Sequence, residues 1–303
     1  MPHPSNNTFC TIITQAYWPY ALAVYEGLQK QHPGLNFSVL VVDAPKTFLK
    51  NPPFPVHLLS DVKKTYPTDY LRIAPYETDP GSRLRWALKP LYIKYLLEVA
   101  GYKKVIFTDP DTYYYNPVDF VWDFLDQKDI CLTPHWRSIE PDQDPSNFSE
   151  LMTGGLFNAG FVTCNQNATD ILDWWLRACA FKMDKQNGFY VDQAYLNLLT
   201  VYFPERLHTI THKGCNLANW NRLVCKRENH NGQVLINGTD PVVFIHFTQA
   251  TIHFIENGKD VLLSLFLEEY RKVLDDILKT ENLQKQKTKK GFRDYFKNIL
   301  QKN

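Results

Sequence analysis

A pair of carboxylates directly follows a short apolar segment in this chain. The residues Lys104–Phe107 have the composition of a buried strand, and they lead without interruption into Thr108-Asp109-Pro110-Asp111-Thr112. Charge at the mouth of a buried strand is costly unless a cation neutralises it. The pattern therefore predicts a strand that ends at the rim of a sheet, with a divalent metal held by Asp109 and Asp111.

An Asp-x-Asp pair in this position suits one kind of chemistry. A Mg²⁺ or Mn²⁺ ion held by one or two carboxylates can anchor the pyrophosphate of a nucleotide-sugar and stabilise the nucleotide as it leaves. Asp-x-Asp also occurs by chance, and the chain has a second copy at Asp142-Gln143-Asp144. That copy lies between two prolines with no apolar strand before it, so we interpret it as part of a solvated loop.

The start of the chain has the element order of a doubly wound α/β sheet. An apolar run over Phe9–Ile13 predicts the first strand, a stretch with helical periodicity follows over Pro19–Gln31, and Asn36–Val42 predicts the next strand. In such a sheet the turn after the first strand faces the ligand crevice, which places Thr14 and Tyr17 there. The alternative is that Tyr17 only packs against the entry to the helix.

The middle of the chain predicts two helices and a long loop. Because Pro90 cannot continue a helix, we expect a break there and a new helix over Pro90–Val99. The polar segment His135–Thr153 predicts a loop over the site. A helix expected over Val191–Tyr202 has Asp192 at its start, where an acid either serves the helix dipole or acts as a reacting group.

One cation and one imidazole are further candidates for the site. Arg85 and Lys89 are four residues apart and share a helical face, so they would meet a phosphate or a carboxylate if that face lines the crevice. The alternative is a solvated charged face. The apolar run Val242–Phe247 predicts a strand that ends near His246, which either binds a metal or is satisfied by a backbone carbonyl.

Composition narrows the class of protein. With 303 residues, of which 44% are hydrophobic, the chain can bury the core of a large α/β domain. The formal net charge of +1 gives no overall field that would recruit a polyanion, so we expect no nucleic-acid partner. The six cysteines include no CxxC pair, which argues against a zinc site.

The chain shows no targeting or membrane-spanning pattern. Its start lacks a basic stretch followed by an apolar core, so we expect a soluble cytoplasmic protein. We interpret the Asn-x-Ser/Thr sequons at Asn6, Asn147, Asn167 and Asn237 as chance occurrences. The tail from 282 to 303 is basic and amphipathic, which allows peripheral contact with a membrane surface; the alternatives are a solvated tail and a helix packed on the domain.

In combination, these segments resemble the metal-dependent nucleotide-sugar glycosyltransferases of the GT-A fold, particularly the group related to glycosyltransferase family 8. The resemblance runs from Phe9 to about Ile255. The segments that carry it are Cys10–Tyr17, Leu88-Lys89-Pro90, Val105–Asp111, Phe157–Phe161, Trp174-Trp175, Val191-Asp192-Gln193, Asn219-Trp220-Asn221 and Ile245-His246-Phe247.

The resemblance implies an α/β fold with a Rossmann-like, mostly parallel central sheet flanked by helices, and a C-terminal helical extension. Residues 1–258 would form the catalytic domain, with a nucleotide-binding half over about 1–112 and an acceptor half over about 113–258. Residues 259–303 would form the extension with its basic amphipathic tail. The partners would be a nucleotide-sugar donor and a glycan or glycoconjugate acceptor.

The resemblance also implies roles for individual residues. Asp109, Asp111 and His246 would bind Mn²⁺ or Mg²⁺, because carboxylate and imidazole both suit such a metal. Asp192 and Gln193 would be catalytic, with the Asp192 carboxylate nearest the anomeric carbon. The residues that would bind the donor are Thr14, Gln15, Ala16, Tyr17, Lys89, Thr108, Asp109, Pro110, Asp111, Asn158, Gly160 and Asn219.

The sequence departs from family 8 in one respect. Members of that family carry a His-x-x-Gly-x-Lys-Pro-Trp stretch near the end, whereas here His246 is followed by Phe-Thr-Gln-Ala. The lysine that contacts the diphosphate therefore has no counterpart, and Lys89, Lys213 or the metal must neutralise the phosphates. The resemblance favours transfer with retention, in which the departing phosphate can take the acceptor proton.

Two other functions fit part of the pattern. In a haloacid-dehalogenase-type phosphatase, Asp109 would be the phosphorylated nucleophile and Asp111 the general acid, but that chemistry needs a further acidic pair at later strand ends. In a non-catalytic carbohydrate- or nucleotide-binding module, the acids would serve only as a calcium site.

Overall fold

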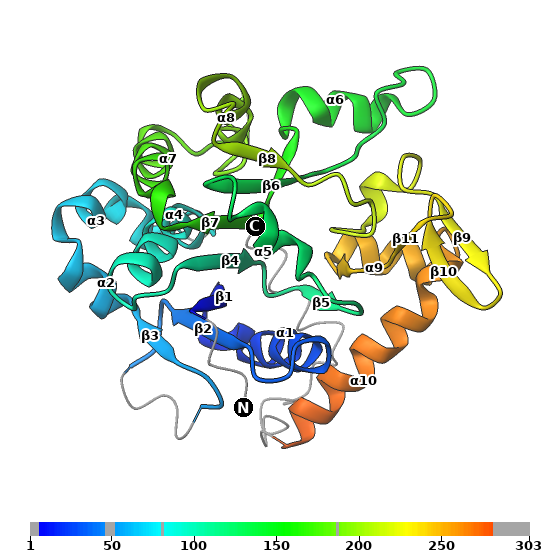
Figure 1. Cartoon of the computed structure of the whole chain (residues 1–303), viewed down its shortest axis with the longest axis horizontal. Coiled ribbons are helices and arrows are strands. Elements are labelled where there is room, and N and C mark those ends of the chain that lie inside the picture. Colours follow the sequence, from blue (N-terminus) through cyan, green and yellow to red (C-terminus); the bar gives the residue numbers. More distant parts are fainter. Residues whose placement is uncertain (1–5, 46–51, 80–81, 186–187, 281–303) are drawn as a thin grey trace.

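A seven-stranded sheet forms the centre of the computed structural model, which describes residues 6–45, 52–79, 82–185 and 188–280. Its strands follow the order β3-β2-β1-β4-β7-β6-β8 (Figure 1). Their bounds are β1 Asn7–Ile13, β2 Asn36–Val41, β3 Val56–Leu58, β4 Lys104–Thr108, β6 Ile130–Pro134, β7 Phe157–Asn165 and β8 Leu207–Thr209.

Most neighbouring strands of this sheet are parallel. The four strands β3, β2, β1 and β4 all run in the same direction, and β6 is parallel to β8. Only β7 is antiparallel to its two neighbours, β4 and β6. The predicted α/β class with a mostly parallel central sheet is therefore confirmed.

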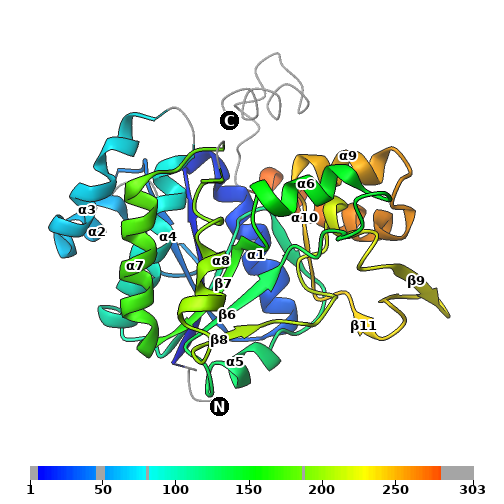
Figure 2. The same ribbon diagram turned by 90° about the horizontal axis from the view of Figure 1, so that it is seen from above.

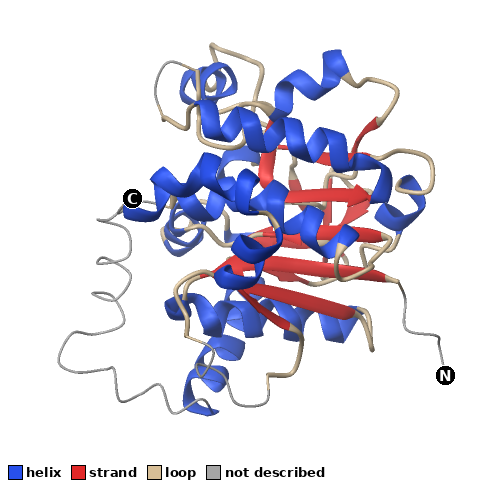
Figure 3. Ribbon diagram, turned by 90° about the vertical axis from the view of Figure 1, so that its left-hand side faces the viewer, coloured by secondary structure: helices blue, strands red, loops and turns tan. Residues whose placement is uncertain are grey.

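Helices cover both faces of the sheet. Alternate strand residues point to opposite sides, and the side chains on both sides are apolar and buried. In β1, Phe9 and Ile13 pack with α1, Trp18–Gln31, whereas Cys10 and Ile12 pack with α4, Arg83–Glu98, and α7, Thr169–Phe181. Figure 2 shows α4 and α7 on one side of the strands and α1 on the other, and Figure 3 shows helices in front of the strands. The buried strands consequently read as continuous apolar runs.

Helix α4 continues through Pro90, so the predicted break at that residue is wrong. A proline inside a helix removes one backbone hydrogen bond and strains the preceding turn. Here Leu88, Leu91 and Tyr92 are all fully or almost fully buried against the sheet and α7. This burial holds the helix together across the proline, and it keeps Lys89 in the same helix as Arg83–Leu88.

The segment expected to be a loop over the site contains a helix in its second half. Helix α6 spans Pro145–Thr153, with Pro145 at its first position. The Asp144 carboxylate accepts a hydrogen bond from the Asn147 backbone N–H at 3.1 Å and so caps the helix. The second Asp-x-Asp copy therefore ends in a helix cap and does not lie wholly in a solvated loop.

The helix predicted to start at Val191 begins later. Helix α8 spans Leu196–Tyr202, so Asp192 precedes it and is not part of its first turn. Val191 itself has a positive φ of 44°, which is incompatible with a right-handed helix. The remaining elements between β2 and β8 are α2 Leu59–Thr65, α3 Pro67–Ile73, η2 Ala74–Thr78, β5 Thr112–Tyr114, α5 Phe120–Phe124 and η3 Gln166–Ala168.

The C-terminal part of the described chain packs against α1. Its elements are η4 Asn219–Asn221, β9 Arg227–His230, β10 Gln233–Ile236, β11 Asp240–Pro241, β12 Phe244–His246, α9 Gln249–Glu256, η5 Val261–Leu263 and α10 Ser264–Thr280. Lys30 of α1 pairs with Glu269 of α10 at 3.3 Å, and Tyr270 of α10 packs against Tyr113. The basic tail from 282 to 303 lies outside the described residues. Among the helices that are described, none combines the length and apolar character that crossing a bilayer requires.

Candidate functional site

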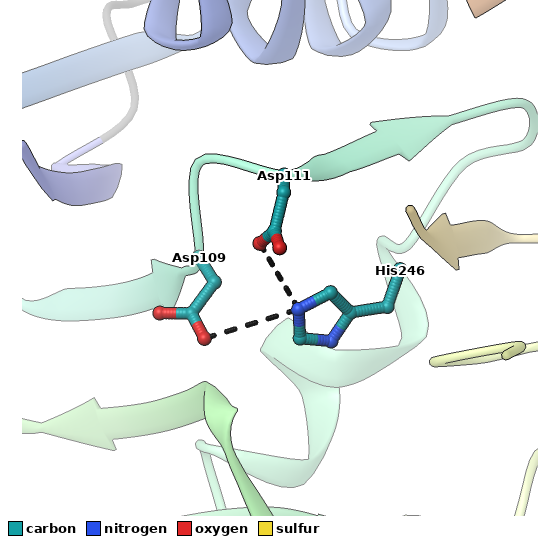
Figure 4. Close-up of side chains that lie close together, drawn as sticks. All are labelled: Asp109, Asp111 and His246. Carbon is teal, nitrogen blue, oxygen red and sulfur yellow. Dashed lines mark hydrogen bonds and ion pairs between the residues drawn. The ribbon is translucent and has the colours of Figure 1, made fainter. Parts of the chain in front are cut away.

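Pairing between β5 and β12 brings His246 to the two acids at the end of β4. The strands are antiparallel, with His246 opposite Thr112, and the Phe247 N–H donates to the Asp111 carbonyl at 2.7 Å. His246 Nε2 consequently lies 3.0 Å from Asp111 Oδ1 and 4.0 Å from Asp109 Oδ2 (Figure 4). One ligand atom from each residue falls within 4.8 Å of the other two.

Hydrogen bonds fix the turn that carries the acids. The Thr112 hydroxyl donates to the Asp109 carbonyl at 2.9 Å and lies 2.8 Å from the Thr108 hydroxyl. The Tyr114 hydroxyl donates to Thr108 Oγ1 at 3.0 Å. On the neighbouring strand, the Gly160 carbonyl accepts from the Asp109 N–H at 2.8 Å. The two carboxylates are thus held in place by their backbone, and Pro110 between them is buried.

Glycine is the only residue type that fits at position 160, beside this group. A Cβ atom at this position would lie 2.5 Å from Asp109 Oδ2, 2.6 Å from Asn158 Oδ1 and 2.9 Å from His246 Cε1. Real Cβ atoms do not approach other heavy atoms so closely, so any side chain here would displace the acids or the imidazole. The glycine serves a close approach and not an unusual backbone angle.

The three side chains offer a set of ligand atoms that could hold a metal ion. Burial alone would lower the pKa of His246, but Asp111 and Asp109 raise that pKa above its usual range. Burial alone would raise the pKa of Asp111, but His246 brings it below its usual range. Two carboxylates and one imidazole suit Mn²⁺, and a cation can replace the proton that the imidazole otherwise holds between the acids.

Lys89 links the group of Asp109, Asp111 and His246 to Asp192. Its ammonium lies 3.0 Å from Asp192 Oδ2 and 3.4 Å from Asp109 Oδ1, and it donates to the Ala159 carbonyl at 3.0 Å. The Lys89 and Asp192 side chains are only 4% and 3% exposed. Burial alone would lower the pKa of Lys89, but Asp109 and Asp192 raise it. Burial raises the pKa of Asp192, and Lys89 partly offsets this effect.

The first predicted donor segment lies at the same edge of the sheet as the acids. Thr14 follows β1, and Gln15, Ala16 and Tyr17 form the short helix η1. Because β1 and β4 are parallel neighbours, their carboxyl ends meet at one edge. Asp43, after β2, accepts from the Gln15 backbone N–H at 2.7 Å, and the Arg85 guanidinium lies over the Tyr17 ring at 5.0 Å.

The other predicted site residues have partners within the protein. Asn158 bonds to Gly160 and faces Asn216 and His246. The Gln193 side chain donates to the Gly154 carbonyl at 2.6 Å. Asn219 accepts a hydrogen bond from Thr251 of α9 at 3.1 Å. The structure thus gathers Asp109, Asp111, His246, Lys89, Asp192, Asn158 and Gly160 into one connected group.

Two residues that the sequence analysis did not assign to the site contact His246. Asn216 Oδ1 lies 3.2 Å from His246 Nδ1, and the Trp220 ring packs edge-on against the imidazole with centroids 5.5 Å apart. Both belong to the amide-rich stretch after β8, which was the available signal in the sequence. The contact itself depends on the pairing of Leu217 with Ile245.

Unusual backbone conformations flank this group. Outside glycine, five described residues have a positive φ, and two of them, Val191 and Asn216, lie at this group. Val191 directly precedes Asp192, and Asn216 contacts His246. Conformations of this kind cost energy and persist where the surrounding structure holds the backbone in place.

Comparison with known proteins bears on the fold. No family model matches the sequence. A Bacillus subtilis (strain 168) protein described as uncharacterized protein YfnF is 23% identical over 267 residues, which are 84% of this chain and 85% of that protein.

Two solved structures resemble the fold. The galactosyltransferase LgtC, in complex with donor and acceptor sugar analogs, has a TM-score of 0.51 at 15% identity, over 89% of this chain and 95% of that one. Mouse xyloside xylosyltransferase 1 has a TM-score of 0.50 at 15% identity, over 81% of this chain and 99% of that one. The fold is therefore the GT-A arrangement of these glycosyltransferases.

Proposed function

We propose that this protein is a metal-dependent glycosyltransferase, related to family 8, that moves a sugar from a nucleotide-diphosphate sugar to a hydroxyl of a glycan or another acceptor. The donor would be a UDP- or GDP-sugar, and the transfer would proceed with retention. The observation that carries the proposal is the group formed by Asp109, Asp111 and His246 at the edge of a GT-A sheet.

The metal would bring positive charge to a place where Lys89 and Lys213 already have partners within the protein. A bound Mn²⁺ or Mg²⁺ would neutralise the donor pyrophosphate and stabilise the departing nucleotide. Lys89 is already paired with the carboxylates of Asp192 and Asp109, at 3.0 and 3.4 Å, and these neutralise its charge. The Lys213 ammonium lies over the Trp136 ring. A bound cation would therefore meet the phosphates in place of these two lysines.

Asp192 is the carboxylate that we assign to the sugar. A negative charge near the anomeric carbon stabilises the positive charge that develops there during transfer. The group is buried, and the ammonium of Lys89 favours its ionised form. We assign Gln193 and Asn158 to the same end of the donor, and Thr14, Gln15, Ala16, Tyr17 and Asn219 to the rest of the donor pocket.

The same proposal covers the division of the chain. We infer that residues 1–258 form the catalytic part, with the nucleotide bound by about 1–112 and the acceptor by about 113–258, and that 259–303 form an extension. The cytoplasmic location remains a prediction.

The test begins with donor binding. We expect Mn²⁺ together with one UDP- or GDP-sugar from a panel to raise the melting temperature, and Mn²⁺ to be required for hydrolysis or transfer of that donor. Asp109→Asn and Asp111→Asn should each abolish the metal dependence. Asp142→Asn is the matched control, because Asp142 is an exposed acid of the second Asp-x-Asp copy.

The outcomes separate the alternatives. Metal dependence that survives in either Asp109→Asn or Asp111→Asn would refute this site. Release of phosphate from simple phosphate esters without sugar transfer would indicate the phosphatase, and binding without any turnover would indicate a non-catalytic module.

A further inference from the structure

The short ladder that brings His246 to the acids has few strand partners. Strands β5 and β12 form a two-stranded sheet with three paired positions, and β12 makes one further bridge, from Ile245 to Leu217. Two strands alone are marginally stable in water and need a layer packed on one face. The position of the His246 imidazole beside Asp111 therefore depends on what covers this ladder.

The ladder has two faces, and helix α10 covers one of them. His246 and Thr112 are opposite each other and lie on the first face. Tyr113 and Ile245 are the next pair along the ladder, so they point to the second face, which Phe247 shares with Ile245. The three side chains of the second face belong to one buried cluster with the apolar side of α10.

Tyr270 of α10 contacts both segments that carry the proposed metal ligands. Its ring stacks on that of Phe247, with centroids 4.4 Å apart and planes 8° from parallel, and it packs against Tyr113 at 5.6 Å. Phe247 directly follows His246, and its N–H donates to the Asp111 carbonyl at 2.7 Å. Tyr113 comes two residues after Asp111. One buried ring thus supports the backbone on both sides of the ladder.

The ring makes these contacts, and the hydroxyl takes no part in them. The Tyr270 hydroxyl is buried and has no hydrogen-bond partner among the described residues. An unpaired buried hydroxyl costs stability, so the packing of the ring has to offset that cost. The helix itself is fixed by other contacts: Glu269 pairs with Lys30 of α1 at 3.3 Å, and the Tyr115 hydroxyl donates to the Phe266 carbonyl. Helix α10 is therefore a firm support for the ring.

We propose that Tyr270 is a positioning residue that holds the ladder of β5 and β12, and through it His246 and Asp111, in the geometry that a divalent cation requires. Metal ligands have to keep their distances to within about 0.2 Å, so they depend on the packing behind them. Loss of the ring should therefore weaken metal binding before it unfolds the protein. The inference rests on the metal site of the proposed function.

Three substitutions separate the effect of the ring from a general loss of stability. Tyr270→Phe keeps the ring and removes the unpaired hydroxyl, whereas Tyr270→Leu removes the ring and keeps an apolar side chain. Leu274→Ala removes a buried side chain one turn further along the same helix. Calorimetric titration with Mn²⁺ should give parental affinity for Tyr270→Phe and Leu274→Ala, and about 10-fold weaker binding for Tyr270→Leu.

Leu274→Ala is the matched control, because it takes core packing from α10 and leaves the Tyr270 ring in place. Circular-dichroism melting shows whether each metal-free variant is folded at the temperature of the titration. If Tyr270→Leu is not folded, Tyr270→Met takes its place, since a flexible methionine fills more of the same space. Parental affinity in the variant without the ring would overturn the proposal, and so would an equal loss of affinity in Leu274→Ala or Tyr270→Phe.

A second measurement needs neither metal nor sugar. Hydrogen exchange of the metal-free protein, followed by NMR, reports opening of the ladder through the Phe247 amide and global opening through the amides of β1. Tyr270→Leu should accelerate exchange at Phe247 at least about 10-fold relative to β1, whereas Leu274→Ala should leave that ratio at its parental value. An unchanged ratio in Tyr270→Leu would refute the support by Tyr270. If the parent fails to bind Mn²⁺, the proposed function loses its metal site, while the exchange result still decides whether Tyr270 holds the ladder.

Discussion

Replacing Gly160 with Ala should weaken metal binding without unfolding the protein. The new Cβ would lie 2.5 Å from Asp109 Oδ2, and ordinary contact begins at 3.4 Å, so the carboxylate or the strand must move by roughly 0.9 Å. Metal sites tolerate errors of only about 0.2 Å in ligand distance. We therefore expect Mn²⁺ affinity to fall about 10- to 100-fold, which corresponds to about 1.4 to 2.8 kcal/mol.

Calorimetric titration measures the affinity directly, and melting curves with and without Mn²⁺ give a second value. At saturating metal the stabilisation by Mn²⁺ should shrink by the same free energy. Ala159→Gly is the control, since Ala159 belongs to the core on the face of the sheet covered by α4 and α7. It should cost about 0.5 to 1 kcal/mol of stability and leave Mn²⁺ affinity unchanged. Parental affinity in Gly160→Ala would refute the claim that this close approach shapes the site.

Two further predictions concern stability. Lys89→Met leaves two carboxylates without their buried cation and should lower the free energy of unfolding by about 3 to 5 kcal/mol in urea; a variant as stable as the parent would show that the pair is not ionised. The pKa of His135 is lowered from 6.5 to about 3 by burial and by Arg137, so the unfolded chain binds a proton between these values that the folded one refuses. Stability that is fully present above about pH 6.5 should therefore fall by about 2 kcal/mol at pH 5. His135→Gln should flatten that part of the pH profile, and an unchanged slope would contradict it.

The sequence predicts the elements whose cause is local. The strand before Asp109 and the β-α-β start of the chain are correct because apolar periodicity and burial on both faces leave few alternatives. The break predicted at Pro90 is wrong because the burial of Leu88, Leu91 and Tyr92 outweighs the local preference of proline. The acid pair is equally local, since both carboxylates come from one turn.

The parts of the site that the sequence missed depend on contacts between distant segments. Asp111 and His246 are 135 residues apart, and only the pairing of β5 with β12 brings them together. The resemblance to a known family supplied His246, because a strand-end histidine alone would have been assigned to a backbone partner. The resemblance did not point to Asn216. Its contact with His246 depends on a positive φ and on pairing with the neighbouring strand, and an amide-rich sequence predicts neither of them.

The same dependence on distant segments describes how the group around the proposed metal ligands is built. Asp109 directly follows β4, Asn158 lies in β7 and His246 lies in β12. A Cβ atom at position 160 would lie 2.5, 2.6 and 2.9 Å from these three side chains. The pairing of β5 with β12 places His246 beside Asp111, which directly precedes β5, and the Gly160 N–H of β7 holds the Asn158 side chain. A site assembled in this way gains its geometry from the sheet and not from flexible side chains, so small changes at Gly160 should affect binding more than larger changes on the surface.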